Sequence, residues 1–258
     1  LEAIAASRKS LTRGWNKEHE LFLKCIKTPE VRNLISIFFL RNKARANNPF
    51  AVVESPPKHV GVLGAGIMGR GIAHAMLAVN IPVTLYDINP KVIAAAVKYI
   101  EGLFMKDVAK GKMKPEEAFK KINLLVVCWS GDLERFSKVD FVIEAVFEDV
   151  KVKHEALNAL QPYLKPGTII ATNTSSILVE DIAKGVANPE NLCALHFFNP
   201  VPLMDLVEIA GHEGSSERSL AQTLALVKAI KKTPILLGHE CSGFVVNRVL
   251  FYYFALAL

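Results

Sequence analysis

The feature that most constrains this chain is the glycine-rich segment GAGIMG at residues 64–69. It fits the pattern GxGxxG and lies between an apolar stretch at 58–64, typical of a buried strand, and a predicted helix at 67–80. In that setting the first glycine allows a tight turn, the second lets a pyrophosphate approach the backbone, and the third lets helix and strand pack closely. The helix N-terminus adds unpaired N–H groups and a partial positive charge. The residues of this predicted dinucleotide site are Gly64, Gly66, Ile67, Met68 and Gly69.

Asp87 ends the next predicted strand, at the place where a carboxylate can bind both hydroxyls of an adenine ribose. The same carboxylate would repel a 2′-phosphate, and Ile88, Asn89 and Pro90 follow it without an arginine. The sequence therefore favours NAD over NADP. Taken alone, Asp87 could equally belong to an ordinary turn at the end of a strand.

Strand-like and helix-like segments alternate along the chain after residue 57. Because the strands are apolar on both faces and are separated by helices, they predict an α/β fold with a doubly wound parallel sheet, as in Rossmann-type domains. Strands are expected at 58–64, 81–87, 139–146, 168–173, 192–198 and 234–238, and helices at 67–80, 90–108, 151–164 and 179–186.

The two ends of the chain differ from this alternating region. Residues 17–47 have the apolar spacing of two helices broken at Pro29, and a linker rich in Pro and Asn follows at 47–57. An apolar helix is expected from Gly243 onward, and the chain end interrupts it. We therefore expect three parts, namely a helical connector and linker at 1–57, a dinucleotide-binding domain at 58–238, and the truncated start of a helical domain at 239–258.

Composition argues against several other classes of protein. The net charge is +6, but the lysines and arginines are spread along the chain, which is typical of a solvated surface and not of a nucleic-acid patch. The four cysteines form no CxxC pair, so free thiols are expected and no metal site. No apolar run approaches the roughly 20 residues that a membrane span needs.

Polar residues recur where the later strands end. They lie in the segments 144–153, 173–176, 196–200 and 243–248. Each has an ordinary structural explanation, such as a solvated helix start for Glu144 and Glu148, an N-cap turn for 173–176, or a hydrogen-bonded core histidine for His196. A charged residue, Glu208, nevertheless follows His196 within an otherwise apolar segment at 195–209.

From Lys58 to its end the chain resembles the L-3-hydroxyacyl-CoA dehydrogenases of fatty-acid β-oxidation. The resemblance rests on the motifs GAGIMGRGIA, VIEAVFED, NTSS, HFFNPVPLMDLVE and GFVVNR, in that order. Residues 17–47 resemble, more loosely and mainly through FFLR at 38–41, the helical connector that follows an enoyl-CoA hydratase domain in multifunctional β-oxidation enzymes.

The resemblance implies a role for each matching residue. His196 would be the general base that takes the proton of the C3 hydroxyl, and Glu208 would hydrogen-bond the other imidazole nitrogen. Ser175 and Asn247 would bind the reacting oxygen. Three further residues match positions near the nicotinamide end of the cofactor, namely Glu148, Lys153 and Asn199.

The resemblance also implies NAD as cofactor, an acyl-CoA substrate, a hydratase domain before Leu1 and a helical domain after the chain end. A fragment of this kind is expected to bind NAD but to be a poor catalyst. The peroxisome is the favoured compartment, with the mitochondrion and the bacterial cytoplasm as alternatives. Two other functions remain open, namely a β-hydroxyacid dehydrogenase that acts on small free acids through a lysine, and a non-catalytic NAD-binding scaffold.

Overall fold

The computed structural model describes residues 1–256 and divides into two compact units, 1–47 and 48–258. The first unit contains the helices α1 (Glu2–Ser7), α2 (Leu11–Ile26) and α3 (Pro29–Ala46). Pro29 opens α3, and the Thr28 side chain caps it by accepting a hydrogen bond from the N–H of Val31. Proline suits the first turn of a helix, so the expected break between two helices lies at this position. The short helix α1 was not expected from the sequence.

Apolar side chains of α3 are exposed on several sides of the helix. Consecutive residues such as Phe38 and Phe39 are 60% and 64% exposed, and they point in different directions around the helix axis. The other large apolar residues exposed on α3 are Leu34, Ile35, Ile37 and Leu40.

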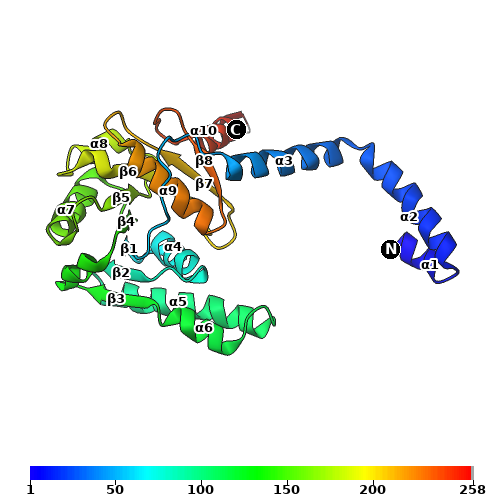
Figure 1. Cartoon of the computed structure of the whole chain (residues 1–258), viewed down its shortest axis with the longest axis horizontal. Helices are drawn as coiled ribbons and strands as arrows, with labels where there is room; N and C mark the ends of the chain where they lie inside the picture. The colour runs from blue at the N-terminus through cyan, green and yellow to red at the C-terminus, as the bar shows by residue number, and fades with distance from the viewer. Residues whose placement is uncertain (257–258) are drawn as a thin grey trace. The chain divides into compact units, whose positions relative to one another are not determined.

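The second unit is built on one sheet of eight strands in the order β3-β2-β1-β4-β5-β6-β7-β8 (Figure 1). The doubly wound α/β fold expected from the sequence is confirmed. The first six strands are parallel, whereas β7 runs antiparallel to β6, and β8 is parallel to β7. The strands are β1 (Val60–Leu63), β2 (Val83–Asp87), β3 (Leu125–Trp129), β4 (Phe141–Glu144), β5 (Ile169–Thr172), β6 (Leu192–Phe197), β7 (Leu206–Ala210) and β8 (Thr233–Leu236).

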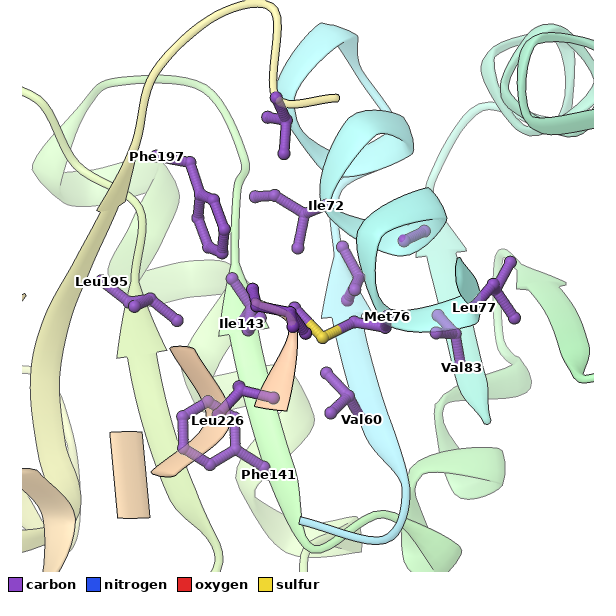
Figure 2. Packing of buried hydrophobic residues seen from close by; sticks show 14 of the residues in the cluster. Val60, Ile72, Met76, Leu77, Val83, Phe141, Ile143, Leu195, Phe197 and Leu226 are labelled. Carbon is purple, nitrogen blue, oxygen red and sulfur yellow. The ribbon is translucent and has the colours of Figure 1, made fainter. Parts of the chain in front are cut away.

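Helices cover both faces of the sheet, and each face has its own apolar core. The larger core lies under α4 (Ile67–Ala78), α5 (Pro90–Ala109) and α9 (Glu217–Ala229). It includes Ile72, Met76, Ile143 and Leu226 (Figure 2). The other core lies under α7 and α8. The helices are α4 (Ile67–Ala78), α5 (Pro90–Ala109), α6 (Pro115–Ile122), α7 (Val150–Leu160), α8 (Val179–Ala183), α9 (Glu217–Ala229) and α10 (Val246–Leu256), with short 3₁₀ helices at Asp132–Lys138, Gln161–Tyr163 and Pro189–Asn191.

Four elements of this unit were not expected from the sequence, namely β3, α6, β7 and α9. β3 is an edge strand whose side chains are mostly half-buried or exposed, so it lacks the continuous apolar run of the inner strands. The carboxyl-terminal helix begins at Val246 and not at Gly243, because Gly243 (φ 77°) and Phe244 (φ 51°) have left-handed backbone conformations that end any helix. Residues 257 and 258 of the expected helical start lie outside the described residues.

None of the helices within residues 1–256 is long and apolar enough to cross a membrane. The expected domain boundaries at 57 and 238 stay predictions.

Candidate functional site

The glycine loop joins β1 to α4 through positions that exclude side chains. Gly64 has φ 101°, and a Cβ there would lie 2.5 Å from the carbonyl oxygen of Ala145, which follows β4. A Cβ on Gly69 would overlap the carbonyl oxygen of Gly64. Both glycines are therefore needed for the close approach of α4 to β1 and β4.

The N-terminus of α4 has the features of an anion site. Its N-cap is Gly66, which has no side chain to accept from the free N–H groups of the first turn. A Cβ on Gly66 would meet nothing within 4 Å, so the space before the helix is open. This cradle fits the pyrophosphate of a dinucleotide, with Ile67 and Met68 offering backbone N–H groups.

Asp87 lies next to this loop at the carboxyl end of β2. Its Oδ2 accepts a hydrogen bond from the N–H of Ala65 (2.9 Å), and its Oδ1 accepts one from the N–H of Asn89 (2.9 Å). The bond from Asn89 forms the turn at the end of the strand, which was the alternative explanation for Asp87. The bond from Ala65 holds the carboxylate beside the glycine loop. The loop and Asp87 are thus brought together, as expected of a ribose and pyrophosphate site.

A buried ionic network lies at the ends of β4 and β5. The Nζ of Lys153, which is 1% exposed, lies 2.9 and 3.0 Å from the two carboxylate oxygens of Glu144 and 3.2 Å from Oε2 of Glu148. Glu144 also accepts from the Thr172 hydroxyl (2.6 Å) and from the N–H of Val146 (2.8 Å). Glu144 is fully buried, so a solvated helix start is wrong for this residue.

Glu148 uses its other oxygen to shape the turn that follows β5. Oε1 accepts hydrogen bonds from the Thr174 hydroxyl (2.6 Å), the N–H of Ser175 (2.7 Å) and the N–H of Ser176 (3.1 Å). Burial raises the pKa of the Glu148 carboxyl, but the bond from Thr174, the charge of Lys153 and the Ser175 N–H outweigh burial and lower the pKa to about 2. The carboxylate is therefore ionised at neutral pH and determines the position of Ser175.

His196 and Glu208 lie opposite each other on the antiparallel pair β6–β7. Opposite residues on one face of such a pair have neighbouring side chains, and the Nδ1 of His196 lies 2.8 Å from Oε2 of Glu208. Both residues are buried, at 4% and 0% exposure. Glu208 Oε1 also accepts from the N–H groups of Val245 (2.9 Å) and Val246 (3.0 Å), so one carboxylate holds both the imidazole and the start of α10.

Two aromatic rings flank the His196 imidazole. Phe244 stacks on it with ring centroids 4.9 Å apart and planes at 20°, and Phe198 lies 4.6 Å away at 55°. The rings and the Glu208 bond together fix the imidazole plane. Nothing within residues 1–256 forms a hydrogen bond to the other ring nitrogen, Nε2. That nitrogen is available to a ligand.

The turn with Ser175 adjoins the same histidine. Asn173 Oδ1 accepts from the N–H of Phe197 (2.9 Å), the residue after His196. Asn247 lies half-buried in the first turn of α10, whose start Glu208 holds. Asn199 is exposed in the segment after β6, and no contact of its side chain with the other site residues is observed in the described part of the chain.

Thr172 was not singled out from the sequence, although it holds Glu144 in this site. Asn173, Thr174 and Phe244 lie in segments that were singled out, but no role was predicted for them individually. The sequence did contain a signal that Glu144 is buried and paired, because this carboxylate ends an apolar strand that would be buried on both faces.

All four cysteines are free thiols. Within residues 1–256 no group of three or more His, Cys, Asp or Glu side chains could hold a metal ion.

The fold and the glycine-loop site define a Rossmann-type dinucleotide-binding domain. A family model described as the NAD binding domain of 3-hydroxyacyl-CoA dehydrogenase matches residues 59–241. This chain belongs to the 3-hydroxyacyl-CoA dehydrogenase family, and it carries the domain that binds NAD.

Solved structures of similar proteins agree with this assignment. FadB2 from M. tuberculosis is 33% identical with a TM-score of 0.74, over 79% of this chain and 71% of that one. The 3-hydroxybutyryl-CoA dehydrogenase of Escherichia coli K12 is 33% identical with a TM-score of 0.74, over 78% of this chain and 42% of that one. The dehydrogenase part of multifunctional enzyme 1 from C. elegans is 26% identical with a TM-score of 0.67, over 84% of this chain and 52% of that one. The chain thus spans about half the length of the last two.

Proposed function

We propose that this chain forms the cofactor-binding and proton-transferring part of an L-3-hydroxyacyl-CoA dehydrogenase. The reaction oxidises the C3 hydroxyl of an acyl-CoA to a ketone, and bound NAD supplies the hydride acceptor. The observation that carries the proposal is the buried pair of His196 and Glu208, with one imidazole nitrogen held and the other free. The similarity to a 3-hydroxybutyryl-CoA dehydrogenase supports the substrate class.

His196 is the general base of the proposed reaction. Glu208 accepts a hydrogen bond from the Nδ1–H of His196, so the neutral imidazole keeps a lone pair on Nε2. Nε2 takes the proton of the C3 hydroxyl as the hydride leaves C3, and the Glu208 carboxylate stabilises the resulting imidazolium. The direction of the hydrogen bond, and hence the tautomer, follows from the fact that an ionised carboxylate can only accept.

Ser175 and Asn247 are proposed to bind the C3 oxygen. Both lie on segments that carboxylates hold in place, Ser175 through Glu148 and the start of α10 through Glu208. Hydrogen-bond donors whose positions are fixed in this way can stabilise an oxygen whose charge changes during the reaction, because they need not reorient first. Three residues are proposed to lie near the nicotinamide end of NAD, namely Glu148, Lys153 and Asn199.

The substitution His196→Gln tests the proposal. We expect turnover in NADH oxidation with acetoacetyl-CoA to fall by roughly 10²- to 10⁴-fold, because a positioned acid–base group contributes about that much. NADH affinity, measured by fluorescence titration, should not change, since the glycine loop and Asp87 are untouched. Near-normal turnover in this variant would rule out His196 as the base.

The choice of substrate separates this function from its alternatives. A lysine-dependent dehydrogenase of small free acids would prefer 3-hydroxyisobutyrate. Lys153 is a buried lysine at this site, but its Nζ forms ion pairs with Glu144 and Glu148. NADH binding without turnover on either substrate would instead support a cofactor-binding scaffold in the chain as given.

We further propose that the chain belongs to a multifunctional β-oxidation enzyme with a hydratase domain before Leu1. The similarity to the C. elegans multifunctional enzyme supports this, as does the helical unit at 1–47. The peroxisome is the proposed compartment. Sequencing upstream of the codon for Leu1 tests the fusion. A hydratase reading frame is expected there, and a start codon directly before Leu1 would contradict it.

A further inference from the structure

We infer that Glu240 is a positioning residue that joins the Ser175 turn to the segment carrying Phe244 and Asn247. Its effect on turnover rests on the proposed function, whereas its effect on the geometry around His196 does not. Glu240 lies in the connection between β8 and α10, outside the residues proposed to touch substrate or cofactor.

Glu240 supplies a helix cap that the local sequence lacks. The N-cap residue of α8 is Leu178, which has no side-chain oxygen and makes no capping hydrogen bond. Glu240 lies 61 residues after Val179 in the chain, and its Oε2 accepts a hydrogen bond from the N–H of Val179 (2.5 Å). The N–H of Glu180 lies 3.2 and 3.3 Å from its two carboxylate oxygens. A carboxylate at a helix N-terminus satisfies free donors and interacts favourably with the helix dipole.

A second contact joins the same two segments. The Ser242 hydroxyl donates a hydrogen bond to the carbonyl oxygen of Ser176 (2.8 Å). Ser176 is the neighbour of Ser175, and both N–H groups are held by Glu148. The chain at 240–242 is thus bound to the turn at 174–180 on both sides of Ile177 and Leu178.

The chain reverses sharply after this attachment. Gly243 (φ 77°) and Phe244 (φ 51°) adopt left-handed conformations, and the N–H of Phe244 donates to the carbonyl oxygen of Cys241 (3.0 Å). A left-handed conformation at a phenylalanine is strained and persists only where surrounding contacts enforce it. The reversal brings the Phe244 ring onto the His196 imidazole and the N–H groups of Val245 and Val246 onto Glu208.

Glu240 therefore determines where this reversal begins. Without its carboxylate, the N–H groups of Val179 and Glu180 lose their acceptor and residues 240–242 lose one of two attachments. Phe244 can then move relative to His196, and Asn247 relative to Ser175. Misplacement of about 1 Å in an active site can cost roughly 10²-fold in rate, so Glu240→Ala should lower kcat by about 10- to 100-fold.

The control substitution is Glu217→Ala. Glu217 also accepts hydrogen bonds from two backbone N–H groups of a distant segment, those of Ala51 and Val52. Within the described residues it contacts none of the residues of the proposed site. Removal of this carboxylate should therefore cost similar stability without an effect on His196.

The decisive readout is the NMR spectrum of the His196 ring protons in the full chain. These resonances are identified by their loss in His196→Gln, and the stacked Phe244 ring shifts them. In Glu240→Ala the ring-current shift should decrease, in Glu240→Gln it should largely be retained because one acceptor oxygen remains, and in Glu217→Ala it should not change. Folded Glu240→Ala with unchanged His196 resonances would overturn the inference.

Turnover and cofactor binding supply the second readout. Glu240→Ala should lower kcat with NADH affinity unchanged, because the glycine loop and Asp87 lie at other strands. If Glu240→Ala does not fold, Glu240→Asp takes its place, because its carboxylate is one methylene shorter and is drawn away from the N–H groups of Val179 and Glu180. Unchanged His196 resonances in folded Glu240→Asp would equally overturn the inference. Normal turnover in His196→Gln would refute the proposed function instead, and the NMR comparison would still decide the role of Glu240.

Discussion

Carboxylates with two separate tasks recur in this domain. Glu208 binds His196 with one oxygen and the start of α10 with the other. Glu148 binds Lys153 with one oxygen and the Ser175 turn with the other. Charged groups are costly to bury unless every partner is satisfied. The two carboxylates therefore hold their partners at fixed distances.

His74 is the opposite case, since both of its ring nitrogens are buried without a hydrogen-bond partner within residues 1–256. Burial lowers its pKa from 6.5 to about 4, with Asp107 opposing the shift and Lys232 adding to it. The imidazole therefore binds a proton more readily in the unfolded chain than in the folded one. Its contribution to the free energy of unfolding is fully present above pH 6.5 and is lost as the pH drops toward 4.

The substitution His74→Leu should remove much of this pH dependence. It should also stabilise the fold near pH 5 by roughly 1–3 kcal/mol, because two unsatisfied buried polar atoms disappear. Urea unfolding midpoints of both proteins across this pH range provide the measurement. A variant whose midpoint falls with pH as steeply as that of the parent would contradict the assignment.

At the scale of the elements, the direction of β7 decides the site. The segment between β6 and β7 is held by the Nζ of Lys232, which donates to the carbonyl oxygens of Val201 (2.7 Å) and Met204 (2.6 Å). Asp205 accepts a hydrogen bond from the Thr233 hydroxyl (2.8 Å) at the start of β8. These bonds hold the connection that lets β7 return beside β6 with Glu208 opposite His196.

The packing of α4 on β1 can be tested by Gly69→Ala. The added Cβ overlaps the carbonyl oxygen of Gly64, so the loop must move, and we expect a lower Tm and lost NADH binding. The matched control is Gly102→Ala in α5, where a Cβ meets nothing within 4 Å. Alanine in an open helical position should stabilise by about 0.5–1 kcal/mol. Equal NADH affinity in both variants would show that the loop tolerates a side chain.

At the scale of the whole molecule, every residue of the proposed site lies in the unit 48–258. The two apolar cores that support the sheet belong to that unit as well. The unit also carries α10, whose aromatic residues Phe251 and Tyr253 are exposed at 65% and 69%. Exposed apolar surface of this kind favours association in solution.

A chain of residues 48–258 alone should therefore fold and bind NADH with the affinity of the full chain. The reason is that the glycine loop, Asp87 and the strands that hold them are all retained. Thermal unfolding and fluorescence titration of both chains provide the comparison. Loss of NADH binding in the shorter chain would show that residues 1–47 contribute to the cofactor site.

Much of the fold could be predicted because its signals are local. Buried strands such as β1 and β4 have continuous apolar runs, and helices such as α5 begin at Asn-Pro. Edge and reversed elements gave weaker signals, since β3 is only partly buried and β7 shares one apolar segment with β6. The contact between His196 and Glu208 was expected only from the family resemblance, because no local pattern places two residues on facing strands.

The sequence by itself determined the glycine loop, the place of Asp87 at a strand end and the alternation of strands and helices, because each depends on a few neighbouring residues. Only the tertiary structure decided that β7 runs antiparallel to β6, that Glu148 shapes the Ser175 turn, and that Glu240 caps α8 from a distant part of the chain. Strand direction and register arise from the packing of distant segments against a common core. Contacts made through that packing have no counterpart in the local pattern of the chain.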